Sequence, residues 1–146
     1  MNKNEKFLRI IVADDDMEDI QLVKESLEEN HLPVNVVEVE SGEALLKMLR
    51  GRNDKSIPQL KPHLIIMDIN MPKKNGFETL VELKNDKELC AIPVIIFSTS
   101  RSQTDIQKAY RLGANCFISK PITSAEWHNT IGKLGRFWIE CASLSQ

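Results

Sequence analysis

The sequence contains no apolar run of bilayer length and no glycine-rich, lysine-ending loop of the kind that cradles nucleotide phosphates. The first absence excludes a membrane-spanning helix, and the second argues against direct binding of ATP. The three cysteines are widely spaced and form no Cys-x-x-Cys pair, so we expect reduced thiols rather than a zinc site or a disulfide framework. A net charge of −2 offers no bulk attraction to nucleic acid.

What the chain does contain fits one ordinary globular domain. Its 146 residues are 42% hydrophobic and 27% charged. The first residues are polar, and the apolar run after them is too short for a secretion signal. We therefore expect a cytoplasmic protein that contacts neither membranes nor nucleic acid directly. We expect one domain over residues 7–138, between short tails at 1–6 and 139–146.

Five short apolar segments rich in β-branched residues predict β-strands. They cover residues 8–13, 34–39, 63–67, 94–97 and 115–118. Apolar runs can also be buried helix segments, but the lengths and the flanking turn residues favour strands. Amphipathic segments alternate with them, the first capped by Asp16 with Ile20 and Val23 on its apolar face. This alternation predicts an α/β fold, with a five-stranded parallel sheet doubly wound by helices in the flavodoxin-like (βα)5 arrangement.

Local signals mark the later helices and one long connection. Ser102 and Asp105 have the spacing of a capping box at the start of the fourth helix, and Thr123 and Glu126 repeat it at the fifth. Residues 51–62 are polar and contain two prolines, so they predict a loop before the third strand.

Four of the predicted strands end in charged or hydroxyl side chains. The first strand runs into the aspartates at 14–16, and the third runs into Asp68. The fourth ends at Ser98, and the fifth leads into Lys120. Ligands of open α/β sheets bind beyond the carboxyl ends of the strands. These side chains are therefore expected to line one pocket that holds a divalent cation together with an anionic group.

The acids of this pocket predict a magnesium site. Asp14, Asp15 and Asp68 would repel one another unless a cation neutralised them, and Mg²⁺ prefers hard oxygen ligands. The loop after Asp68 brings a backbone carbonyl at Asn70 into range. Taken alone, the aspartates at 14–16 would be read as a helix cap favoured by the helix dipole. Their combination with Asp68 and Lys120 makes the metal site the better interpretation.

The remaining groups suggest phosphoryl chemistry at Asp68. Lys120 precedes Pro121, which keeps its backbone extended, so its ammonium can pair with Asp68 and with an anion attached to it. Ser98 can donate a hydroxyl hydrogen bond to the same anion, although helix capping would also explain a serine there. A carboxylate nucleophile, a metal and fixed positive charge are what aspartyl-phosphate formation needs. We expect a protein to bring the phosphoryl group.

These motifs together resemble the receiver domain of two-component response regulators. The matching pieces are Asp14-Asp15, Asp68, Met71-Pro72, Gly76, Ser98 and Lys120-Pro121, over roughly residues 7–135. The resemblance implies that Asp68 is the phosphoacceptor, and that a sensor kinase or a histidine phosphotransfer protein is the donor. It also implies that Asp15 and Asp68 ligate Mg²⁺ by their side chains and Asn70 by its carbonyl, with Asp14 acting nearby through water.

The resemblance further implies a switch. Ser98 and Lys120 would contact the phosphoryl oxygens, and Phe117 occupies the place of an aromatic ring that turns inward on activation. Serine and phenylalanine replace the commoner threonine and tyrosine, and Phe117 is equally well explained as a core aromatic. Thr99 stands where the family often has a small residue, so we hypothesise that it crowds the pocket.

The C-terminal segment has an apolar stripe at helical spacing. Trp127, Ile131 and Leu134 are expected to pack on the sheet, whereas Phe137 and Trp138 suggest a partner surface. This ending resembles single-domain receivers that work with phytochrome-type kinases, which implies a homodimer through the C-terminal helix and tail. About twenty residues follow the start of the last helix, too few for a DNA-binding output unit. We therefore expect a stand-alone regulator that signals by protein–protein interaction.

Three other functions compete with this one. A Mg²⁺-dependent aspartyl phosphatase or phosphotransferase would need a second acid two residues after its nucleophile. Asn70 stands there and cannot shuttle a proton, so we do not expect a turnover enzyme. A flavodoxin-like cofactor binder fits an acidic strand edge poorly. A degenerate receiver that is never phosphorylated is disfavoured, because the acid, hydroxyl and lysine positions are all filled.

Overall fold

The computed structural model describes residues 7–51 and 61–142. The predicted N-terminal tail, most of the predicted loop at 51–62 and the last four residues lie outside the described residues. Among the helices that are described, none is long and apolar enough to cross a bilayer.

The described strands form one parallel sheet, as the sequence predicted. They are β1 (Leu8–Ala13), β2 (Val34–Val39), β3 (Leu64–Met67), β4 (Val94–Ser98) and β5 (Cys116–Ser119). The strand order is β2-β1-β3-β4-β5, and every pairing is parallel. The predicted bounds hold to within one residue at every strand end. The order reverses direction beside β1, so the carboxyl ends of β1 and β3 lie next to each other.

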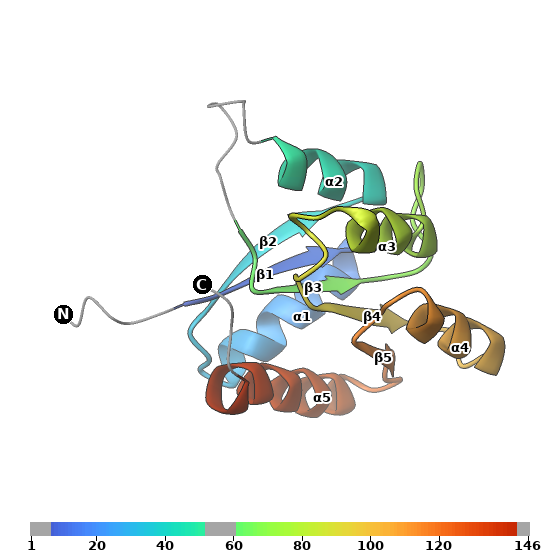
Figure 1. Cartoon of the computed structure of the whole chain (residues 1–146). Coiled ribbons are helices and arrows are strands. Elements are labelled where there is room, and N and C mark those ends of the chain that lie inside the picture. The colour runs from blue at the N-terminus through green and yellow to red at the C-terminus, as the bar shows by residue number, and fades with distance from the viewer. Residues whose placement is uncertain (1–6, 52–60, 143–146) are drawn as a thin grey trace.

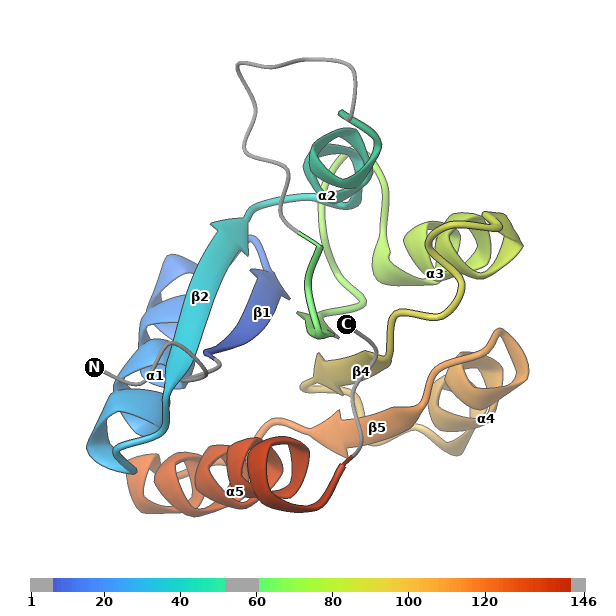
Figure 2. The same ribbon diagram turned by 60° about the vertical axis from the view of Figure 1, so that its left-hand side comes forward.

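Five α-helices connect the strands and cover both faces of the sheet. They are α1 (Met17–Glu29), α2 (Gly42–Arg50), α3 (Gly76–Asn85), α4 (Gln103–Arg111) and α5 (Ser124–Arg136). Helices α1 and α5 lie together on one face, and α2, α3 and α4 lie on the other (Figures 1 and 2). Each face therefore has its own hydrophobic core, and the doubly wound fold is confirmed.

The central strand β3 explains the uninterrupted apolar runs of the sequence. All four of its residues, Leu64 to Met67, are buried, because helices cover the sheet on both sides. The edge strand β2 alternates instead between partly buried and exposed positions over most of its length. Strands β1 and β3, which lead into the acidic residues, are therefore covered on both faces, whereas the edge strand β2 is partly exposed to solvent.

The helix caps follow the sequence signals, and Thr123 caps α5 through the N–H of Glu126, but both capping boxes predicted at α4 and α5 show only this half. The Asp16 side chain accepts hydrogen bonds from the backbone N–H groups of Glu18 and Asp19, as a cap of α1 should. Ser102 caps α4 through the N–H of Asp105. The second half of that predicted capping box is wrong, because the N–H of Ser102 donates to Ser100. The Asp105 carboxylate is engaged by the Ser100 hydroxyl at 2.7 Å.

A short π-helix, η1 (Phe137–Cys141), continues α5 past residue 138, where the sequence placed the end of the domain. Trp127 and Ile131 are buried against α1 and the sheet, as expected. Trp138 also packs against this core, whereas Phe137 is 54% exposed. The two aromatics proposed as a partner surface therefore point to different environments, with their rings edge to face.

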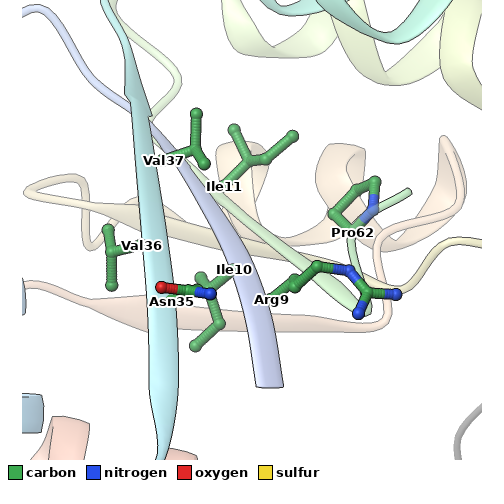
Figure 3. A pocket seen from close by; sticks show the side chains of 7 residues that line it. All are labelled: Arg9, Ile10, Ile11, Asn35, Val36, Val37 and Pro62. Atoms are coloured by element: carbon green, nitrogen blue, oxygen red, sulfur yellow. The ribbon is translucent and has the colours of Figure 1, made fainter. Parts of the chain in front are cut away.

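A pocket of about 220 Å³ lies at the opposite end of the strands from the acids. Side chains of β1 and β2, together with Pro62, line it (Figure 3): Arg9, Ile10, Ile11, Asn35, Val36 and Val37. The Arg9 guanidinium is already engaged by the Lys61 carbonyl at 2.9 Å. This pocket is therefore separate from the strand ends on which the sequence places the chemistry.

Candidate functional site: an acidic pocket with a buried lysine

Three carboxylates converge at the carboxyl edge of β1 and β3. Ala13 pairs with Met67, and the N–H of Asp68 donates to the Ala13 carbonyl at 3.0 Å. This register brings oxygens of Asp14, Asp15 and Asp68 within 4.8 Å of one another. Asp14 and Asp68 are buried, and Asp15 is exposed. The sequence predicted this convergence from the strand ends alone.

Lys120 is held in this pocket by its backbone and by its side chain. Its N–H donates to the Ser98 carbonyl at 2.7 Å, and its carbonyl accepts from Arg101 at 3.2 Å. The side chain is buried, and its ammonium lies 3.3 Å from Oδ2 of Asp68 and 2.7 Å from Oδ2 of Asp14. The predicted pairing of Lys120 with Asp68 is present and is shared with Asp14.

Sequence reasoning missed a fourth carboxylate, that of Asp19. Its Oδ2 accepts a hydrogen bond from the Lys120 ammonium at 2.7 Å. Asp19 lies in the first turn of α1, where an acid is common because it complements the helix dipole. Its place in the first turn of the helix that Asp16 caps, directly after the acidic end of β1, is the signal that could have drawn attention to it.

Burial and neighbouring charges shift the pKa values of Asp14 and Lys120. Burial raises the pKa of Asp14 to about 6, and the hydrogen bonds from Lys120 and from the N–H of Asp16 offset only part of that rise. Because this pKa lies above the ordinary value of 3.8, protonation of Asp14 stabilises the metal-free fold. This contribution is fully present below pH 3.8 and is lost as the pH rises through about 6. Burial alone would lower the pKa of Lys120, but hydrogen bonds to Asp14 and Asp19 outweigh it and raise that pKa.

The Asp68 backbone depends on a glycine eight residues later. Oδ1 of Asp68 accepts from the N–H of Ile69 at 2.8 Å, which orients the carboxylate. The N–H of Gly76 donates to the Ile69 carbonyl at 2.8 Å, so the start of α3 lies directly against this segment. A Cβ on Gly76 would lie 2.3 Å from the Asp68 carbonyl oxygen. Only glycine allows α3 to approach the acidic edge this closely.

The other predicted site residues surround the pocket in different environments. Ser98 is fully buried, and its hydroxyl oxygen accepts from the N–H of Ser100 at 3.2 Å. Thr99 and Asn70 are exposed. Phe117 is partly buried against the core under α2, α3 and α4, and its N–H donates to the Tyr110 hydroxyl at 3.0 Å.

This donor set suits a hard divalent cation. Among the described residues, the one group of acids, histidines and cysteines close enough to share an ion consists of three aspartates. Carboxylate oxygens, with water and backbone carbonyls completing the sphere, are the ligands that Mg²⁺ and Mn²⁺ prefer. Lys120 adds a fixed positive charge beside the same carboxylates. The pocket can therefore bind a metal ion and an anion side by side.

Residues 10–132 match the family model of the response regulator receiver domain. The chain belongs to this family. It is 29% identical over 136 residues to the response regulator Rcp1 of Synechocystis sp., covering 92% of this chain and 91% of that protein. It is also 32% identical to the protein PilH of Pseudomonas aeruginosa, covering 84% of this chain and 93% of PilH.

Solved structures give the same assignment. The phosphorylated cyanobacterial phytochrome response regulator RcpA superposes with a TM-score of 0.89 at 33% identity, over 97% of this chain and all of that chain. The Mn²⁺-bound form of Rcp1 superposes with a TM-score of 0.85 at 29% identity, over 94% of this chain and 99% of that one. The chain is therefore a two-component response regulator akin to the phytochrome-associated ones, which confirms the resemblance seen in the sequence.

Proposed function

We propose that this regulator accepts a phosphoryl group on Asp68 from a histidine of a sensor kinase or a phosphotransfer protein. The observation that carries the proposal is the buried Lys120 ammonium, 3.3 Å from an Asp68 oxygen in a pocket with three further carboxylates. A buried lysine among acids gives the fixed positive charge that a transferred phosphoryl group needs. The test is phosphorylation of the native chain and of Asp68→Asn, described in the Discussion.

The transfer balances as a simple displacement. A carboxylate oxygen of Asp68 forms a bond to phosphorus while the bond between phosphorus and the donor imidazole nitrogen breaks. The electron pair stays on that nitrogen, and the imidazole takes up one proton. Lys120 remains protonated throughout, since its pKa is raised. No general acid or base on this chain is required, which is consistent with an amide at Asn70.

The metal of this reaction is proposed to be Mg²⁺. Asp15 and Asp68 would hold it by their side chains, Asn70 by its carbonyl and Asp14 through water. Bound Mg²⁺ supplies positive charge that neutralises the phosphoryl oxygens of the donor. The clustering of Asp14, Asp15 and Asp68 within 4.8 Å supports this ligand set.

Lowering the pH from 7.5 to 5 is expected to weaken Mg²⁺ binding about tenfold. With a pKa of about 6, Asp14 is ionised at pH 7.5 and mostly protonated at pH 5, and a proton competes with the cation for the pocket. Isothermal titration calorimetry measures the affinity at both values. Asp14→Asn should bind more weakly at pH 7.5 and lose most of the pH dependence. Equal affinity of the native protein at the two values would contradict the prediction.

Phosphorylation is proposed to act through Ser98 and Phe117. Ser98 is next to Lys120 across the β4–β5 pairing, and its hydroxyl oxygen accepts from the N–H of Ser100, so its O–H remains able to donate to a phosphoryl oxygen. Phe117 lies on the edge strand β5, where inward rotation would alter the α4 side of the molecule. Thr99 is exposed next to Ser98, and its side chain is proposed to slow entry of the phosphodonor into the pocket.

The surface beside the pocket fits a protein as the phosphodonor. Met17 is 48% exposed at the start of α1, two residues after Asp15, and Ile122 is 86% exposed, two residues after Lys120. Exposed apolar side chains beside a reactive carboxylate are typical of a docking surface.

We expect Ile122→Asp to reduce phosphotransfer from a phosphorylated histidine phosphotransfer protein at least tenfold, which is about 1.4 kcal/mol of lost docking energy. Labelling by acetyl phosphate should change by less than about twofold, because a small donor needs no docking surface. Val81→Asp, at an exposed apolar position on α3, is the matched control and should leave both rates unchanged. A parallel loss with both donors would mean that Ile122 supports the pocket rather than the partner.

A homodimer through the C-terminal helix is a second proposal, favoured by the exposed ring of Phe137. Phe137→Glu is expected to shift the protein toward the monomer, since burying a new charge in an apolar interface is costly. Light scattering coupled to size exclusion measures the mass, and Val81→Glu serves as the surface control. The same mass for the native chain and Phe137→Glu at every concentration would exclude this interface.

A further inference from the structure

The hydrogen-bonding capacity of Lys120 is fully used in the unphosphorylated protein. An ammonium has three N–H donors, and three carboxylates accept them. The distances are 2.7 Å to Asp14, 2.7 Å to Asp19 and 3.3 Å to Asp68. The longest of the three is the one to the proposed phosphoacceptor. A phosphoryl oxygen can bind Lys120 only if one of the present acceptors gives way.

Of the two acceptors that do not receive the phosphoryl group, Asp19 can be released at lower cost than Asp14. The Asp14 side chain is 6% exposed, and its other oxygen is held by the N–H of Asp16 at 2.9 Å. The Asp19 side chain is 20% exposed, and Lys120 is its one side-chain donor among the interactions of the described residues. Water can therefore replace the ammonium at Asp19, whereas Asp14 would be left as a buried, uncompensated charge.

The position of Asp19 is more directed than a helix-dipole role requires. Asp19 lies three residues after the cap Asp16, where an acidic side chain usually turns back to the cap backbone or faces solvent. Here the side chain instead reaches a lysine 101 residues away in sequence, at the end of a different strand. That contact holds the ammonium toward α1.

We propose that Asp19 is a positioning residue that occupies a hydrogen bond of Lys120 which a phosphoryl oxygen on Asp68 would need, and so limits the rate of phosphorylation. This inference rests on the proposed function of Asp68. Asp19 slows phosphorylation in two ways. It competes with the phosphoryl oxygens for Lys120, and it adds a fourth negative charge to a pocket that must receive an anionic donor.

Replacing Asp19 with asparagine tests the inference. The amide keeps the size of the side chain and an oxygen acceptor but loses the charge, so we expect the initial rate of labelling by acetyl phosphate at saturating Mg²⁺ to rise roughly tenfold. Asp19→Glu keeps the charge and should return the rate toward the native value. Asp16→Asn removes a neighbouring charge that does not contact Lys120, and asparagine also caps helices, so it should change the rate by less than about twofold.

The sign of the change separates positioning from mere structural support. A supporting residue would slow phosphorylation when removed, so a rate for Asp19→Asn equal to or below native overturns the inference. Far-UV circular dichroism checks the fold, and Asp19→Ser provides a second variant if asparagine disturbs it. Native labelling that depends on Asp68 but not on Asp19 refutes this inference alone. Failure of the native chain to label refutes it together with the proposed function.

A nuclear magnetic resonance signal of the Lys120 side chain gives an independent readout. With ¹⁵N-labelled lysine, the Nζ resonance should shift when beryllium fluoride, a phosphoryl mimic, is added with Mg²⁺. In Asp19→Asn the resonance before addition should already lie closer to the end point, because the ammonium is free to move toward Asp68. An Nζ resonance identical to that of the native protein would contradict the release of Lys120 from Asp19.

Discussion

Asp68→Asn is expected to abolish phosphorylation while leaving the fold intact. The amide is nearly isosteric with the carboxylate, and it can still accept from the N–H of Ile69, which orients the native side chain at 2.8 Å. It cannot act as the nucleophile, because the amide oxygen carries no full negative charge. Removing one acid also reduces the repulsion in the pocket, so no loss of stability is expected.

Intact-protein mass spectrometry after incubation with acetyl phosphate and Mg²⁺ measures this directly. The native chain should gain one phosphoryl group, and this gain should disappear with a chelator and in Asp68→Asn. Asp16→Asn is the matched control, since it removes an exposed acid of the same cluster and retains a helix cap. If Asp68→Asn were labelled as fast as the native chain, the phosphoacceptor would have to be another residue.

Lys120→Met is expected to have the largest effect on stability. Lys120 and Asp14 are both buried, and removing one partner of a buried ion pair leaves an uncompensated charge at a cost of about 3 kcal/mol. The cost should be greatest near pH 7.5 and smaller at pH 5, because Asp14, with a pKa of about 6, becomes neutral as the pH falls through that value. Mg²⁺ should restore part of the lost stability by neutralising the same carboxylates.

Urea unfolding at the two pH values, with and without Mg²⁺, measures the free energy in each state. Lys87→Met is the control, since Lys87 is an exposed lysine that follows the C-terminal end of α3, and it should change stability by less than about 0.5 kcal/mol. A loss of stability for Lys120→Met that is independent of pH would show that packing of the lysine stem, rather than its charge, supports the pocket. Labelling by acetyl phosphate should also fall sharply in this variant.

Much of the candidate site could be predicted because it lies at strand ends. Asp14, Asp68 and Lys120 each follow an apolar strand, and parallel strands present their carboxyl ends at one edge. No packing detail is needed for that conclusion. The capping role of Asp16 was also local information, since a cap bonds only to the next few residues.

Asp19 could not be predicted in the same way. Its role depends on the phase of α1, on the angle at which α1 crosses the sheet, and on the length of the Lys120 side chain that reaches it. The same limit applies to Phe137 and Trp138, which are adjacent in sequence. The π-helical turn η1 places one against the core and the other in solvent, and no sequence period announces that turn.

The sequence by itself determined the doubly wound sheet, the family and the edge at which the acids and the lysine meet, because strand period and strand ends are local properties of the chain. The tertiary structure alone decided how Lys120 divides its three hydrogen bonds, how far burial raises the pKa of Asp14, and why Gly76 must lack a side chain. These features depend on differences of a few tenths of an ångström in the distances between segments far apart in sequence. Packing sets those distances.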